Sequence, residues 1–207
     1  MGINKEIYDK LSELNLLNFS IKKNAIIIGE QQFYGCNVSE DYSLFKHFLI
    51  KNGWSAESID LGSHPVYKTA LKHDLACDLP ESLLGKFDIL FDFGTGEHVR
   101  NQLTYWKNCE KLLTPGGERI HVLPLPNTWQ NHCKYRYPST FFDALCEHFK
   151  YENKVIEILE KNKNSKNDQS LIFVYFLNSL DFNDHIFDTE VAKKIDVLEN
   201  FIDKESL

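Results

Sequence analysis

The sequence lacks the features that mark secreted or membrane-spanning chains. Its five cysteines form no CxxC pair and are odd in number, so we expect reduced thiols rather than a disulfide framework. No apolar run reaches roughly 18 residues, which argues against a membrane-spanning helix. The opening stretch, MGINKEIYDKLSEL, has no apolar core of a signal peptide. We therefore expect a cytoplasmic protein without a membrane partner.

Basic residues are also in short supply. The chain has 23 Lys and Arg against 30 Asp and Glu, a formal net charge of −7. Because nucleic acids are bound mainly by clustered Lys and Arg, this balance argues against a nucleic-acid partner. With 43% hydrophobic and 26% charged residues, the 207-residue chain has the composition of a globular protein. We predict a single domain over residues 1–207, with its core at about 20–178 and a helical extension at each end.

Two predominantly apolar segments predict buried strands, the first a continuous apolar run of the kind found in a parallel sheet. They are AIIIG at 25–29 and FDILFDF at 87–93. Further strands are expected at 55–62, weakly at 69–73, and at 118–126, 154–160 and 170–177. Because no helix separates the last two, they should pair as an antiparallel hairpin.

Helices are expected where apolar residues recur at helical spacing. The predicted helices cover 7–14, 39–51 with Ser39 as the cap, 103–113, 139–149, and a last one from about 190. A TPGG break at 114–117 separates the third helix from the next strand. Alternating helices and strands, closed by a hairpin, predict an α/β fold with a doubly wound, mostly parallel sheet and an antiparallel edge.

A specific resemblance is carried by residues 87–126, FDILFDFGTGEHVRNQLTYWKNCEKLLTPGGERIHVLPLP. A strand followed by an EHV turn (97–99), then a helix ending in LLxPGG (112–117), resembles the class I S-adenosylmethionine (SAM) dependent methyltransferases. The resemblance covers roughly 20–178. It implies a Rossmann-like sheet of seven strands, SAM as cofactor, and methyl transfer as the activity.

The first loop departs from that family. Its members usually have a D/E-x-G-x-G-x-G loop, whereas this chain reads IIIGEQQFYG and keeps only Gly29 and Gly35. The resemblance implies that Glu30 or Gln31 holds the amino group of the ligand. The alternative left open is that a chain with this loop has lost SAM binding.

Further cofactor contacts are expected beyond the carboxyl ends of the strands, where open α/β sheets bind ligands. Asp60 can accept hydrogen bonds from both ribose hydroxyls, although a turn Asp before Gly62 is the alternative. Asp74 falls where the family places an acid near the adenine, and Asp78 is its rival. The complete predicted cofactor set is Gly29, Glu30, Gln31, Asp60, Leu61, Asp74, Leu75, Phe93 and Gly94.

Two histidines are candidates for the base that removes the acceptor's proton, since imidazole titrates near neutral pH. His98 is the first candidate and His132 the second, with a structural contact at the helix start as the alternative for His98. Some methyltransferases bind a divalent ion at an ExxEH motif, but here Gly94 replaces the first Glu. We therefore predict no metal; a metal site would need His121 or His132 to complete it.

The loop after the fifth strand, WQNHCKYRYP at 129–138, is expected to contact the acceptor or to be a solvated loop. The predicted acceptor-binding residues are Glu97, His121, Trp129, Tyr135 and Arg136, with Arg136 able to grip an anion bidentately. We expect methyl transfer to oxygen or nitrogen of a small polar metabolite of the sugar or nucleotide-conjugate type. The alternatives are a non-catalytic, partner-binding protein and a SAM-fold enzyme with another chemistry, and a homodimer is left open.

Overall fold

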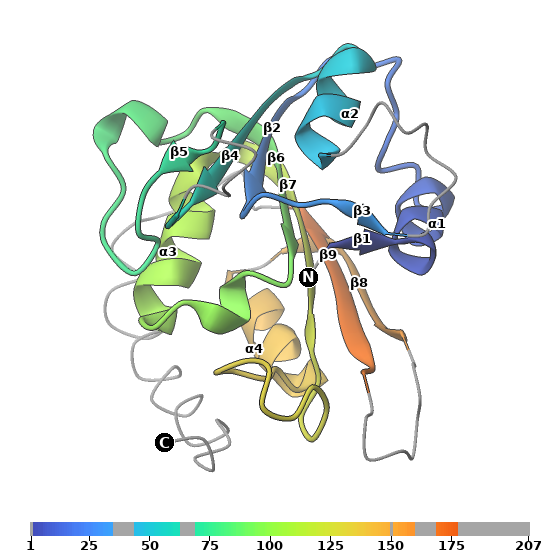
Figure 1. Ribbon diagram of the computed structural model, residues 1–207, viewed down its shortest axis with the longest axis vertical. Helices are drawn as coiled ribbons and strands as arrows, with labels where there is room; N and C mark the ends of the chain where they lie inside the picture. The colour runs from blue at the N-terminus through green and yellow to red at the C-terminus, as the bar shows by residue number, and fades with distance from the viewer. Residues whose placement is uncertain (1, 35–43, 63–68, 150, 160–168, 178–207) are drawn as a thin grey trace.

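A seven-stranded sheet organises the chain, in the order β5-β4-β2-β6-β7-β9-β8 (Figure 1). The computed structural model describes residues 2–34, 44–62, 69–149, 151–159 and 169–177. The strands are β2 (Asn24–Ile28), β4 (Ser55–Asp60), β5 (Leu71–Lys72), β6 (Phe87–Phe93), β7 (Leu113–Pro124), β8 (Glu152–Leu159) and β9 (Leu171–Leu177).

The strand order reverses between β2 and β6. From β2 the chain moves outward through β4 to β5, and it then returns to β6 on the other side of β2 and continues to β7. These five strands are parallel to one another. The strand β9 is antiparallel to both β7 and β8. The predicted doubly wound, seven-stranded sheet with a C-terminal antiparallel hairpin is therefore confirmed.

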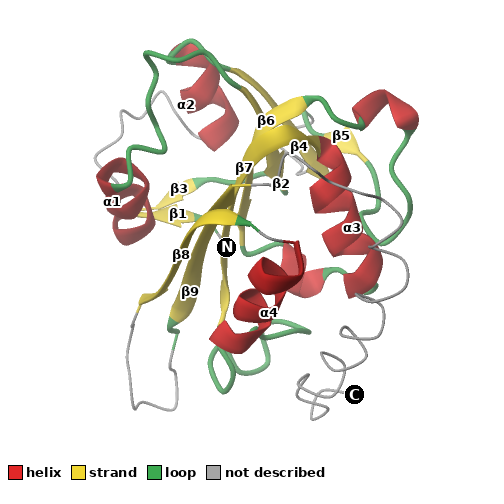
Figure 2. Cartoon of the chain, turned by 180° about the vertical axis from the view of Figure 1, so that it is seen from behind, coloured by secondary structure: helices red, strands yellow, loops and turns green. Residues whose placement is uncertain are grey.

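Helices bury both faces of the sheet. Side chains alternate along a strand, so Ile27 in β2 packs with α1 (Lys5–Glu13) and α2 (Phe45–Lys51), whereas Ile26 faces the other side. That side is covered by α3 (Gln102–Leu112) and α4 (Ser139–Phe149), which lie together in the foreground of Figure 2. Among the described residues, no helix combines the length and apolar character needed to cross a membrane.

Two predicted helices lie wholly or partly outside the described residues. The predicted Ser39 cap is outside them, and the described part of that helix begins at Phe45, after Leu44. The helix predicted from about 190 also lies outside them. The first helix is capped by Asn4, whose Oδ1 accepts a hydrogen bond from the N–H of Ile7 at 2.9 Å.

The predicted break at TPGG is wrong in detail. The helix α3 does end at Leu112, just before the TPGG residues. However, β7 begins at the next residue, Leu113, and runs through Pro115, Gly116 and Gly117. Pairing of Leu113 with Phe87, followed by a register shift before Ile89, makes this possible. Gly116 has φ +75°, which lets the strand bend where another residue would be strained.

Two short strands were not predicted. The strands β1 (Ile3–Asn4) and β3 (Phe33–Tyr34) pair in parallel beside the main sheet. Two short 3₁₀ helices, η1 (Glu81–Leu83) and η2 (Gly96–His98), precede and follow β6. Each of these elements spans only two or three residues, which is too short to produce a periodic pattern.

A buried ion pair joins α3 to β7. Glu110 is 4% exposed and Arg119 is fully buried, and their carboxylate and guanidinium groups are in direct contact. The hydroxyl of Tyr151 also donates to Glu110, and the guanidinium carbon of Arg119 lies 4.7 Å from the Tyr151 ring centroid. Burial raises the pKa of Glu110, and the nearby guanidinium opposes that rise. Each charge therefore depends on the other for its place in the core.

Replacing Glu110 by Ala should destabilise the protein strongly, because it leaves Arg119 as an uncompensated buried charge. The expected loss in the free energy of unfolding is about 3–5 kcal/mol. Glu157→Ala is the matched control, since Glu157 is exposed and pairs with Lys10 at 2.9 Å. That change should cost less than about 1 kcal/mol. Urea unfolding followed by circular dichroism measures both, and equal losses would contradict a structural role for the buried pair.

Candidate functional site

A buried carboxylate holds the turn at the carboxyl end of β6. Asp92 is fully buried, and its Oδ1 accepts the N–H of Thr95 at 2.9 Å. Its Oδ2 accepts the hydroxyl of Tyr105 at 2.5 Å and lies 3.3 Å from Nδ1 of His121. A side chain at position 96 would meet the Tyr105 hydroxyl at 2.5 Å, so only Gly96 fits beneath this network.

His121 belongs to that buried network. Its ring has no exposed surface and packs on Trp106 with 4.7 Å between ring centroids. Burial lowers its pKa, against the opposing effect of Asp92. The structure therefore places His121 in the core, where it has no exposed surface to offer an acceptor.

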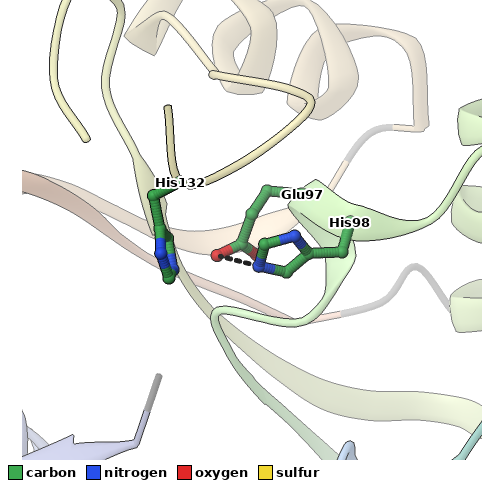
Figure 3. A group of neighbouring side chains, drawn as sticks. All are labelled: Glu97, His98 and His132. Atoms are coloured by element: carbon green, nitrogen blue, oxygen red, sulfur yellow. Dashed lines mark ion pairs between the residues drawn. The ribbon is translucent and has the colours of Figure 1, made fainter. Parts of the chain in front are cut away.

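Three of the predicted site residues do meet, at the end of the same turn (Figure 3). Glu97 and His98 follow β6 in η2, and His132 approaches from the loop after β7. One donor atom from each of the three lies within 4.8 Å of the others. His98 Nε2 is 3.8 Å from Glu97 Oε1, and the two imidazole centroids are 5.4 Å apart. We call Glu97, His98 and His132 the donor group.

Burial sets the charge of the donor group. The side chain of Glu97 is fully buried, and neither of its carboxylate oxygens has a hydrogen-bond partner. Its pKa is raised to about 8, first by burial and then by the nearby charge of Asp92. Burial lowers the pKa of His98, helped by His132, and also lowers that of His132. Near neutral pH the group therefore holds a protonated Glu97 and neutral imidazoles that can accept a proton.

The loop that carries His132 has an unusual backbone held by defined contacts. Three of its non-glycine residues, Asn127, Trp129 and Asn131, have φ between 51° and 63°. Asn adopts this region readily, but a bulky residue such as Trp129 rarely does, and its strained backbone costs on the order of 1–3 kcal/mol, which the surrounding contacts must offset. The N–H groups of Lys134 and Tyr135 donate to the carbonyl of Glu97 at 3.2 and 3.0 Å. These bonds hold the loop against the turn after β6.

Arg136 points into its own loop. Its Nε donates to the carbonyl of Thr128 at 2.6 Å, and its Nη2 donates to the carbonyl of Trp129 at 3.1 Å. The side chain is 8% exposed. The role as an anion clamp stays a prediction, whereas the contacts of this guanidinium fix the loop backbone.

The other predicted aromatic residues flank the loop. Trp129 donates its Nε1 to the carbonyl of Gln169 at 3.0 Å, and its ring lies 5.1 Å from that of His132. The hydroxyl of Tyr135 donates to the carbonyl of Arg100 at 2.7 Å. Trp129 therefore lies beside the donor group, and Tyr135 anchors the far end of the loop.

At the predicted cofactor position, polar side chains bridge the ends of β2 and β6. Gly29 leaves β2 with φ +76°, and a Cβ there would meet Thr95 Oγ1 at 2.3 Å. The Nε2 of Gln31 donates to the carbonyl of Ile28 at 2.9 Å and to Thr95 Oγ1 at 3.0 Å. The Oε1 of Gln31 is buried without a hydrogen-bond partner. Gln31 and Thr95 thus connect the ends of β2 and β6 at the switch point.

Glu30 faces a polar cluster that the sequence did not predict. Its Oε1 accepts from Ser58 at 2.5 Å and from Thr69 at 3.2 Å, and Lys46 Nζ lies 3.6 Å away. Lys46 is 6% exposed, and its ammonium also donates to Ser58 at 3.0 Å. The Oε2 of Glu30 has no partner. A lysine within the apolar helix face of 44–49 is the one sequence signal that could have indicated this cluster.

The remaining predicted cofactor residues lie along the same edge of the sheet. Asp60 ends β4 half-buried, where it accepts the N–H of Glu30 at 3.1 Å and that of Gly62 at 3.0 Å. Asp74 is exposed and accepts the N–H of Ala76 at 2.9 Å. The others are Leu61, which is exposed, Leu75 and Phe93, which are in the core, and Gly94, which has φ +86°.

Comparison with known proteins identifies the fold. No protein-family model matches the sequence. A search of functionally characterised proteins also found no match. Among solved structures, the N-methyltransferase NodS from Bradyrhizobium japonicum, in complex with S-adenosyl-L-homocysteine, is similar at TM-score 0.56 and 17% identity, over 84% of this chain and 88% of that chain.

Two further structures extend the likeness. The 1,6-didemethyltoxoflavin-N1-methyltransferase of Burkholderia thailandensis has TM-score 0.56 and 12% identity, over 82% of this chain and 77% of its own. A SAM-dependent methyltransferase from Methanosarcina mazei has TM-score 0.55 and 11% identity, over 87% of this chain and 100% of its own. The chain thus has the Rossmann-like fold of SAM-dependent methyltransferases, as its resemblance to the family implied. A shared fold does not by itself define the activity.

Glu97 should make the metal-free protein less stable as the pH rises. Its pKa is about 8 in the folded state, above the ordinary value of 4.5, so between these values the folded state binds more protons than the unfolded chain. The free energy of unfolding should then fall by up to about 1.4 kcal/mol per pH unit in this window. Glu97→Gln should largely remove this slope. Urea unfolding across the window, with a chelator present, measures it, and parallel pH profiles would contradict the raised pKa.

Proposed function

We propose that this protein transfers a methyl group from SAM to oxygen or nitrogen of a small polar metabolite. The observation that carries the proposal is the place of the donor group. It lies at the turn that follows β6, beside the switch point at which this fold receives ligands. Groups that can bind a cofactor and groups that can take a proton thereby share one edge of the sheet.

The residues at the switch point suit parts of SAM. Buried oxygens of Glu30 and Gln31 that lack hydrogen-bond partners are acceptors for an ammonium group. Each carboxylate oxygen of Asp60 accepts one backbone N–H, which leaves lone pairs for the hydroxyls of a ribose. When bound, SAM supplies a methyl group on a positively charged sulfur. Gln31 must give up its bond to Thr95 if the methionine part is to enter the crevice.

The size of one cavity is evidence for a small acceptor. This cavity has a volume of about 210 Å³, lies at the carboxyl ends of β7 and β8, and is lined by Asn4, Glu6, Tyr34, Trp129 and Gln169 among others. Trp129 forms one wall and contacts His132, so the cavity adjoins the donor group. The lining is mainly apolar, with Ile7, Leu159 and Leu171 beside Trp129, and Asn4, Glu6 and Gln169 supply polar groups for the hydroxyl or amino groups of a metabolite. The sugar or nucleotide-conjugate class stays our finer proposal.

The imidazoles of the donor group are the proposed proton acceptors. A hydroxyl acceptor must lose its proton as it attacks the methyl carbon, and an ammonium must lose a proton before its nitrogen can attack. The lowered pKa values of His98 and His132 keep both rings neutral at pH 7, which is the form that accepts a proton. His98 is the first candidate, because it leaves η2 beside the switch point with 44% of its side chain exposed.

One observation favours the second candidate function, a non-catalytic methyltransferase-like protein. The Gln31–Thr95 bridge fills the crevice where the family has a glycine-rich loop. A chain in which this bridge stays closed would keep the fold and bind no SAM. Direct measurement of SAM binding separates the two functions.

SAM should bind, and Asp60→Ala should weaken that binding. Each lost hydrogen bond to the carboxylate should cost roughly 1.5–3 kcal/mol, with water recovering part of it. Glu57→Ala on the same strand, where Glu57 is exposed, should bind SAM like the wild type. Isothermal titration calorimetry measures all three proteins. An unchanged affinity in folded Asp60→Ala would remove Asp60 from the site, and no binding by the wild type would favour the non-catalytic protein.

His98→Ala should lower methyl transfer by about 10²–10⁴-fold, the usual contribution of a general acid or base. The affinity for SAM should change little, because the ring faces the proposed acceptor side. Transfer of labelled methyl groups from SAM into a pool of small polar metabolites provides the assay. His132→Ala is the paired variant. Wild-type turnover in His98→Ala with loss in His132→Ala would reverse the assignment, and retention in both would show that neither ring is needed.

A further inference from the structure

The donor group combines a buried acid with two accessible imidazoles. Neither carboxylate oxygen of Glu97 accepts a hydrogen bond, although the side chain is fully buried. A buried polar group without a partner is costly, and nearly all such groups in folded proteins are satisfied. The nearby Asp92 carries a negative charge, so it disfavours a negative charge on Glu97. What the carboxylate lacks is a cation or a donor.

We propose that Glu97, His98 and His132 bind one divalent transition-metal ion. Three different donor atoms already lie within 4.8 Å of one another. Metal bonds of about 2.1 Å require donor atoms no more than about 4.2 Å apart. The rings of His98 and His132 are both partly exposed and can rotate by this small amount.

The ligand types indicate which ions would bind. Two imidazoles and one carboxylate suit zinc, manganese, iron or cobalt better than calcium or magnesium, which prefer oxygen. Three protein ligands leave coordination positions open for water or another oxygen ligand. The sequence predicted no metal, because Gly94 stands where an ExxEH motif has its first Glu. His132 supplies the third ligand from a different loop.

The backbone prepares this arrangement before any ion arrives. The carbonyl of Glu97 accepts the N–H groups of Lys134 and Tyr135, which follow His132 by two and three positions. The Arg136 contacts fix the same loop from its other side. Bringing His132 to Glu97 is therefore a property of the fold, so binding should need little rearrangement. If the ion is bound during methyl transfer, His98 and His132 act as its ligands rather than as free bases.

Metal binding can be measured without SAM and without an acceptor, so the test is independent of the proposed methyl transfer. Chelator-treated, dialysed protein is titrated with Zn²⁺ by calorimetry and with Co²⁺ by visible absorption. We expect saturable binding of one ion per chain and a higher melting temperature with the ion. Loss of an outer hydrogen-bond partner costs roughly 10–100-fold in metal affinity, so Glu97→Gln and His132→Ala, which remove ligands, should each cost at least as much.

His47→Ala is the matched control for adventitious histidine binding, since His47 lies on α2 and is not among the residues whose donor atoms gather in the donor group. Its affinity should equal that of the wild type. Melting without metal checks that Glu97→Gln is folded. The proposal is overturned by the absence of saturable binding in the wild type, or by wild-type affinity in His132→Ala. A Co²⁺–thiolate absorption band would place the ion on a cysteine such as the neighbouring Cys133 and would also overturn it.

Discussion

The carboxylate of Asp92 is the contact on which the arrangement of this protein's site depends. It lies at the end of β6, and it bonds to the turn that follows, to Tyr105 in α3 and to His121 in β7. A buried carboxylate requires such partners, and its partners in turn are fixed by it. The turn after β6 is thereby held in one shape, and that shape aims Glu97 inward and leaves His98 partly exposed.

The donor group adds a second constraint that spans a greater distance along the chain. Glu97 offers its carbonyl to the loop after β7 and its carboxylate to the space between His98 and His132. Three residues of this loop, Asn127, Trp129 and Asn131, have positive φ. The contacts of Arg136 with the loop carbonyls help to fix this backbone. Because its position is fixed, the loop can bring His132 beside His98.

The switch point follows a different design. The glycine-rich loop of the family leaves room for a ligand, whereas here Gln31 and Thr95 bond to each other across the crevice. Buried oxygens of Gln31 and Glu30 remain without partners beside it. Such oxygens are costly to bury, and a ligand with donor groups would relieve that cost. The same loop therefore carries both the Gln31–Thr95 bond and the acceptor oxygens of the proposed cofactor site.

Much of the fold could be predicted from local patterns. The apolar runs in β2 and β6 indicate strands buried on both faces, and the absence of a helix before β9 indicates the hairpin. The boundaries of some elements could not be predicted in this way. The start of β7 at Leu113 depends on pairing with Phe87, which lies 26 residues earlier in the chain. The pair β1 and β3 was missed because two residues produce no pattern.

The sequence by itself determined the sheet, the helices that cover it and the clustering of Glu97 and His98 after β6, because these follow from neighbouring residues. Only the tertiary structure decided that His121 lies in the core, that Arg136 binds its own loop and that His132 meets His98. Those outcomes depend on how residues distant in sequence pack, and on a loop in which Trp129 has a positive φ that is unusual for a bulky residue. A local pattern carries no information about either, since the energies that decide them come from contacts formed only when the chain has folded.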